Sequence, residues 1–172
     1  MKWEFRLSQL PSPLKALITA FISVLIFGYG ASFVLLSDTT GLEPQGIEEN
    51  YNGNEDSDSD GPLKFRKSKY EMMNIVHTHA FTLSALFLIM SALVYFTHLP
   101  TGLKKFFMVE PLLSIITTFG SILLVWQGFF AFNYVVLISG LLMHGSFLAM
   151  ILIVLYEIFL VKPDPVQDPE SI

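Results

Sequence analysis

The sequence predicts an all-α membrane protein, a four-transmembrane-helix bundle with one long acidic extracytoplasmic loop. Of its 172 residues, 52% are hydrophobic and only 15% are charged, which is too apolar for an ordinary soluble domain. Four apolar runs each reach the roughly 20 residues that a helix needs to cross a bilayer. One acidic stretch separates the first run from the other three, and this order predicts the loop.

The four predicted spans are residues 13–36, 72–97, 106–127 and 132–160. Ser12 and Pro13 look like an N-cap followed by a proline at the first helical position, and they mark the start of the first span. This run is longer than the roughly 7–15 apolar residues of a secretory signal, so we expect a retained helix.

Boundary residues define the other spans. Ser68 and Glu71 have the spacing of a capping box, which starts the second helix just outside the lipid. Glu110 and Pro111 either kink the third helix or mark its true start. Aromatic residues surround the very short turn 128–131, as at a membrane interface, so the third and fourth helices are predicted to form an antiparallel hairpin.

The distribution of charge predicts the orientation. Eight acidic residues lie between Asp38 and Asp60, and the loop 37–71 is therefore expected outside. Six basic residues lie in or beside segments 1–12, 98–105 and 161–172, which are expected to be cytoplasmic, with a disordered tail at the C-terminus. Nothing resembles a nucleic-acid-binding patch, and the absence of cysteine excludes disulfides and thiolate metal sites.

Each predicted helix has one polar or small side. In membrane bundles such sides pack together through close contact and hydrogen bonds, so we expect the four to converge. Buried histidine and glutamate are costly in a membrane and mark function more often than hydroxyls do. In chain order, the four faces are Thr19, Ser23 and Gly30; His77, Ser84, Ser91 and His98; Glu110, Ser114, Thr117, Thr118 and Ser121; and Asn133, Gly140 and His144.

Two histidines stand near the start of the second helix. Because consecutive helical residues turn by about 100°, His77 and His79 point roughly 200° apart and only one can face the core. The small neighbours of His77 favour an inward orientation of that residue. The depth of His79 in the membrane, however, is closer to that of His144. Two histidines on facing helices can hold a b-type haem, with Gly140 leaving room for it. Another metal, such as copper or zinc, or simple hydrogen bonding across helices are the alternatives.

Two more ionisable residues lie near the predicted cytoplasmic face. Glu110 could hydrogen-bond to His98 or to a bound quinol, because proton-coupled quinol chemistry needs an acid and a histidine. The plain alternative is an interfacial histidine and a carboxylate in contact with head-group water.

The loop and the second helix carry three short motifs, a G-x-x-P-x-G-I turn, a Y-x-G-N-E element and an H-x-H helix entry. They resemble the outer loop and second helix of small bacterial multi-pass membrane proteins, over residues 41–55 and 65–81. The resemblance implies a bacterial inner-membrane setting and no particular activity. Independently of it, Ile47 and Tyr51 could dock the loop onto the bundle. The motif residues are Gly41, Pro44, Gly46 and Ile47; Tyr51, Gly53, Asn54 and Glu55; and His77 and His79.

Three functional hypotheses follow. The first is a membrane subunit that binds haem b through His144 with His79 or His77, and passes electrons between the quinone pool and an outer-side partner. The second is a cofactor-free accessory or assembly subunit of a larger membrane complex. The third is a small metal or proton conduit through Glu110 and the hydroxyl-bearing face. The expected partners are the lipid bilayer and either other membrane subunits or quinone. No nucleophile stands at a recognised spacing from a base, so no intrinsic catalytic activity is expected.

Overall fold

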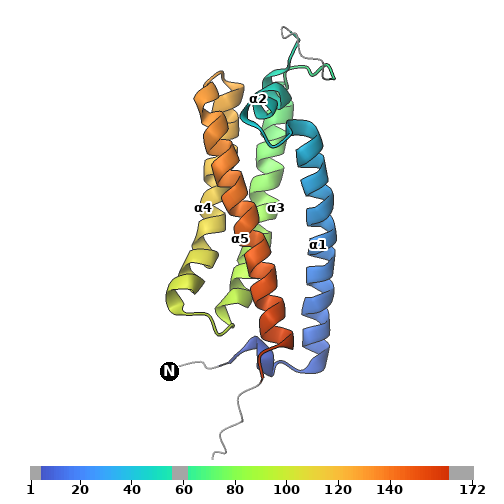
Figure 1. The fold of residues 1–172 in the computed structure, drawn as a ribbon, viewed down its shortest axis with the longest axis vertical. Coiled ribbons are helices and arrows are strands. Elements are labelled where there is room, and N and C mark those ends of the chain that lie inside the picture. The colour runs from blue at the N-terminus through green and yellow to red at the C-terminus, as the bar shows by residue number, and fades with distance from the viewer. Residues whose placement is uncertain (1–4, 56–61, 163–172) are drawn as a thin grey trace, which may run out of the picture.

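The structure, a computed structural model, describes residues 5–55 and 62–162. Four long helices dominate it: α1 (Ser12–Thr40), α3 (Lys69–Tyr95), α4 (Thr101–Trp126) and α5 (Asn133–Phe159). Each is long and apolar enough to cross a membrane. They run side by side as a bundle (Figure 1), and the described residues contain no strand. The predicted fold class is confirmed.

Three of the four helices are longer than the predicted spans, whereas α5 is slightly shorter than the predicted span 132–160. Helix α1 continues four residues past residue 36, because the first stop signal is Gly41, whose left-handed backbone (φ 60°) caps it. Its N-cap is Pro11 and not the predicted Ser12. The capping box of Ser68 with Glu71 is confirmed, and α3 begins with it. Helix α4 begins at Thr101 and contains Pro111, so the proline lies within the helix and does not start it.

The bundle consists of a tightly packed trio and a fourth helix at its side. Helices α4 and α5 form the predicted antiparallel hairpin, joined through a short 3₁₀ turn, η2 (Phe130–Phe132), and α3 packs against both (Figure 1). Met90, Val94, Val125, Met150 and Val154 have no exposed surface and form the centre of this trio. Helix α1 has its most extensive contact with α2, at one end of the bundle, and has fewer contacts with α5.

The predicted convergence of the four polar faces is only partly right. In an 18-residue stretch of α1 only 6% of the residues are buried, against 44% in α4. Lipid tails are as apolar as the side chains, so no hydrophobic force draws α1 inward. Most of the polar face of α4 is buried, whereas α1 and the first half of α3 expose most of theirs. The buried members are Ser91, Glu110, Ser114, Thr118, Ser121 and Asn133, and the exposed ones are Ser23, Gly30, His77, Ser84, His98 and Thr117.

The acidic loop is more structured than a connector. It contains α2 (Pro44–Asn52), which lies across one end of the bundle, here called the α2 end (Figure 1). Ile47 is buried beneath it, as expected, and Tyr51 packs against the core. The contact requires a glycine at position 46, because a Cβ there would lie 1.9 Å from the carbonyl oxygen of Thr40. The acidic run 56–60 and the C-terminal tail from 163 lie outside the described residues.

Hydrogen bonds to backbone carbonyls close the α2 end. Asn52 Nδ2 donates to Val125 (2.9 Å), and Arg66 donates to Trp126 (2.8 Å). The indole Nε1 of Trp126 in turn donates to the carbonyl oxygen of Lys67 (2.8 Å). These hydrogen bonds hold the loop after α2 against the C-terminal end of α4. Lys64 Nζ fastens it to α1 through the carbonyl of Thr39 (2.8 Å).

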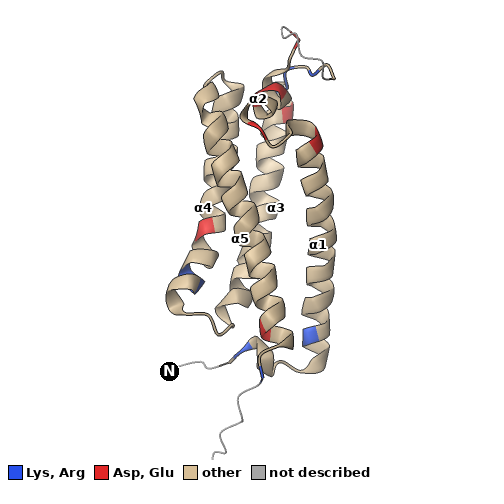
Figure 2. Cartoon of the chain, viewed as in Figure 1, with Lys and Arg blue, Asp and Glu red and all other residues tan. Residues whose placement is uncertain are grey.

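The opposite end is closed by the N-terminal segment. Its short 3₁₀ helix, η1 (Leu7–Gln9), defines what is here called the η1 end. Leu7 is buried, and its backbone N–H donates to the carbonyl of Phe96 at the end of α3 (3.0 Å). Lys15 Nζ returns from α1 to the carbonyl of Ser8 (2.8 Å). Figure 2 shows that acidic residues gather at the α2 end, with one on α4 and one near the end of α5.

Candidate functional site

The two histidines of α3 have different neighbours. Both are exposed on the bundle surface. His79 Nδ1 donates to the carbonyl of Ile75 (2.7 Å), and its ring stacks on Phe119 of α4 with centroids 5.0 Å apart. The ring of His77 lies 4.9 Å from Phe81, one turn along its own helix. His79 is therefore the histidine that meets a neighbouring helix.

His144 faces elsewhere. It is half-buried on α5, and the centroid of its ring lies 5.5 Å from that of Tyr29 on α1, in an edge-to-face arrangement. A Cβ placed on Gly140 would meet nothing within 4 Å. Within residues 5–55 and 62–162, no three His, Asp or Glu side chains lie close enough together to hold a metal ion. His79 faces α4 and His144 faces α1, so they do not fit a bis-histidine haem within one chain.

Glu110 does not pair with His98. It is 9% exposed on α4, and its Oε1 accepts a 2.5 Å hydrogen bond from Ser114 Oγ, one turn along the same helix. Its other oxygen, Oε2, is buried and has no hydrogen-bond partner among the described residues. One of the two carboxyl oxygens of Glu110 therefore has a hydrogen bond and the other has none, at a depth that lies within the membrane.

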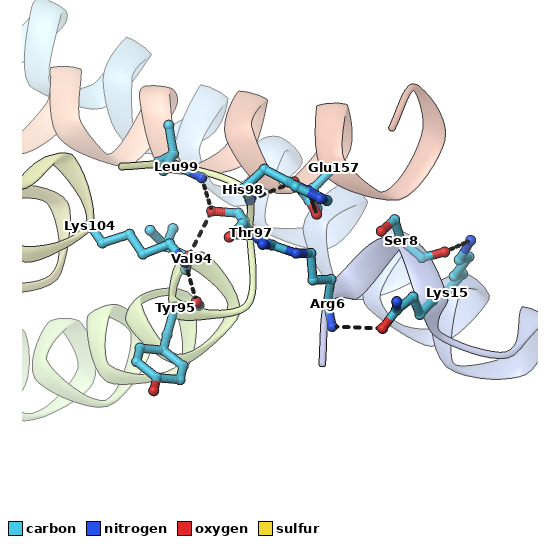
Figure 3. A network of polar contacts seen from close by, with 11 residues as sticks. Arg6, Ser8, Lys15, Val94, Tyr95, Thr97, His98, Leu99, Lys104 and Glu157 are labelled. Carbon is cyan, nitrogen blue, oxygen red and sulfur yellow. Dashed lines mark hydrogen bonds and ion pairs between the residues drawn. The ribbon is translucent and has the colours of Figure 1, made fainter. Parts of the chain in front are cut away.

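The partner of His98 is Glu157, near the end of α5. One oxygen of its carboxylate lies 2.5 Å from His98 Nδ1, and the other accepts the backbone N–H of His98 at 2.9 Å (Figure 3). Glu157 is 2% exposed, whereas about a third of the His98 side chain (34%) remains exposed. The pair therefore joins the α3–α4 loop to α5 and leaves one side of the imidazole accessible.

Sequence reasoning missed Glu157 because it stands near the end of an apolar run, where an interfacial residue is ordinary. The available signal was its isolation: it is the only acidic residue between 132 and 160. Its distance from His98 in the sequence, 59 positions, hid the contact. Glu110 is much closer to His98 in the sequence, and it was therefore the predicted hydrogen-bond partner of His98.

Two basic side chains surround this pair (Figure 3). Arg6 Nη1 donates to the carbonyl of Thr97 (3.1 Å), next to His98. Lys104 Nζ donates to the carbonyl of Tyr95 (2.9 Å) and lies over the ring of the same tyrosine. Positive charge near the end of α3 complements both the helix dipole and the buried carboxylate of Glu157.

An apolar groove of about 770 Å³ lies beside the pair. Residues 97–100 form one wall, and one face of α5 between Leu152 and Leu160 forms the other. His98 and Glu157 contribute an imidazole and a carboxylate to a lining that is otherwise mostly apolar. This arrangement suits a small molecule with a polar head and an apolar tail.

The spanning helices and their polar ends define a multi-pass α-helical membrane protein. The family model Aq_1264_TM, described as a transmembrane helical domain, matches residues 41–165, and the chain belongs to that family. The match covers the structured loop, α3, α4 and α5. No curated protein and no solved structure matched the chain.

Proposed function

We propose that the protein is a membrane subunit that binds a quinone-type molecule at the η1 end and so takes part in electron transfer with the quinone pool. The observation that carries the proposal is the His98–Glu157 pair in the wall of the groove. A histidine and a buried carboxylate beside an apolar groove provide what a quinone head and its apolar tail require.

The two residues have separate roles in this proposal. The imidazole of His98 is the contact for a quinone oxygen, and it donates a proton on binding or accepts one from a quinol. Glu157 holds the ring in place through Nδ1 and through the backbone N–H. The electrons come from a redox centre of a partner subunit.

The position of the groove agrees with the solubility of a quinone, which dissolves in the bilayer. A quinone reaches the groove from within the bilayer, and the apolar face of α5 accommodates its tail. The excess of lysine and arginine near the η1 end supports a cytoplasmic position for that end. The proposed setting is the bacterial inner membrane with both termini inside.

Quantifying bound quinone by mass spectrometry tests the proposal. The wild-type protein, purified in mild detergent, is expected to retain quinone, and the variants His98→Ala and Glu157→Gln are expected to lose it. His77→Ala, an exposed histidine on α3, is the matched control and should keep it. Wild-type protein without quinone, or equal amounts in all four proteins, would overturn the proposal.

The exposed polar faces favour a second candidate, an accessory subunit that docks onto neighbouring subunits. Ser23 on α1, and His77 and Ser84 on α3, carry polar groups on the outside of the bundle. Polar groups facing lipid are costly, so a partner helix is a natural cover for them. This candidate predicts copurification with larger subunits at fixed stoichiometry and no chromophore.

The haem prediction has its own test. A reduced-minus-oxidised absorption spectrum of the purified protein reports a b-type haem directly. If a haem band is present and His144→Ala abolishes it while the protein remains in the membrane, haem binding holds. An unchanged spectrum in that variant would remove His144 as a ligand.

A further inference from the structure

Away from the η1 groove, a second groove of about 640 Å³ runs along the interface of α4 and α5. Its walls are mostly apolar, and two of the lining residues, Leu113 and Ile138, are exposed on the surface of the bundle. Four polar side chains line it: Glu110, Ser114, Thr117 and Ser139. Its size falls in the range of about 300–1,000 Å³ that is usual for small-molecule sites.

The hydroxyl groups of this groove already donate to acceptors of the protein. Ser114 donates to Glu110 (2.5 Å), and Thr117 donates to the carbonyl of Leu113 (3.1 Å). Ser139 donates to the carbonyl of Val135 (2.6 Å) and also contacts the hydroxyl of Thr118 (2.8 Å). None of these groups needs a ligand.

Glu110 is different. Its side chain is nine-tenths buried in the groove wall, and Oε2 lacks a hydrogen-bond partner within the described part of the chain. The next residue, Pro111, has no backbone N–H, so the carbonyl of Phe107 lacks its usual helical donor. This part of α4 therefore offers acceptors and no spare donor.

Oε2 is a buried and unpaired acceptor at membrane depth, where an unsatisfied polar group is costly, so a donor that reaches it would be stabilising. No lysine or arginine lines the groove to supply one. We propose that the α4–α5 groove binds an amphiphile that carries a hydrogen-bond donor, an alcohol or an amine, with Oε2 of Glu110 as its acceptor. The apolar walls of the groove hold its chain.

Dicyclohexylcarbodiimide, an apolar reagent that modifies carboxyl groups, tests this site in the wild-type protein. The reagent is expected to modify Glu110, and peptide mapping locates the adduct. Octadecanol and octadecylamine supply a neutral and a cationic donor, while methyl stearate has the same chain length without a donor. With one hydrogen bond of ordinary strength, the alcohol should protect Glu110 at about fivefold lower concentration than the ester.

Protection by both donors, or by the amine alone, supports the site and identifies the head group. Equal protection by the ester shows simple exclusion by any chain and overturns the proposal, as does a folded protein in which Glu110 does not react. Glu110→Gln should abolish labelling at that position, and Glu157→Gln should leave it unchanged. Because the quinone test reads the other groove, either proposal can fail alone.

Discussion

At the α2 end, loop side chains donate to backbone carbonyls and a glycine permits close contact of α2 with α1, whereas at the η1 end a buried carboxylate holds a histidine beside a groove. At the α2 end, Asn52, Lys64 and Arg66 donate to the neutral carbonyls of Val125, Thr39 and Trp126. At the η1 end Glu157 is the main acceptor, and two basic side chains lie nearby.

The difference indicates which end does chemistry. Side-chain donors on neutral backbone carbonyls fix the position of a loop, and a backbone carbonyl does not take up or release a proton near neutral pH. A histidine bonded to a carboxylate can exchange protons, and here part of its side chain remains accessible. We therefore propose that the α2 end has a structural role and that the η1 end is the functional one.

The largest effect is expected from Gly46→Ala at the α2 end. The new Cβ would lie 1.9 Å from the carbonyl oxygen of Thr40, so either α2 or the end of α1 must move. Overpacking against backbone costs about 3 kcal/mol or more when neither side can yield. Thermal unfolding in detergent should show a large loss of stability. Gly28→Ala on α1, where a Cβ meets nothing, is the control and should be neutral or slightly stabilising.

At the η1 end, Glu157→Ala is expected to destabilise the protein by about 1–3 kcal/mol, because it removes a buried acceptor of two hydrogen bonds. The isosteric Glu157→Gln retains one acceptor and should cost less. Chemical unfolding of the two variants in the same detergent measures the difference. If both are as stable as wild type, the pair does not hold the loop to α5.

Alkaline pH should loosen the α2 end. Burial raises the pKa of Tyr51 from 10.0 to about 12, against a smaller lowering effect of a hydrogen bond with Asn50. The folded state thus holds the phenolic proton more tightly than the unfolded state. The contribution of Tyr51 to stability is complete below pH 10 and is lost as the pH rises to 12. Unfolding followed between these values should show this loss, and Tyr51→Phe should reduce it.

The smallest effect is expected inside the trio of helices, between the two ends. Thr118→Val removes the 2.8 Å contact with Ser139, which keeps its bond to the carbonyl of Val135. Interhelical hydrogen bonds in membrane proteins contribute about 0.6 kcal/mol on average. A loss above that of Glu157→Ala would contradict the view that the ends hold the bundle more firmly than this contact.

Apolar length was enough to predict four helices, because a bilayer tolerates few alternatives. Ile47 was also predictable, as an apolar residue in an acidic loop, and the structure buries it. The structure also gives local roles to the loop motifs: Gly41 caps α1, Pro44 begins α2 and Gly46 allows the two helices to meet.

The site was harder to predict because it depends on contacts between distant residues. Helical spacing gave the face of Glu110 correctly, yet spacing cannot show which faces lie on the outside of the bundle, and so Ser84 was wrongly placed inside. Spacing and depth left the choice between His77 and His79 open, and both side chains are exposed. His98 was recognised as a candidate, but its partner lies on α5. The polar face of one helix does not show which helix packs against it.

The most direct test of the central claim is photo-cross-linking with an azido-quinone in native membranes, followed by peptide mapping. We expect adducts within residues 97–100 and 152–160 that excess quinone prevents and that Glu157→Gln strongly reduces. Adducts spread over the lipid-facing surface, unaffected by excess quinone, would contradict a quinone site at the η1 end.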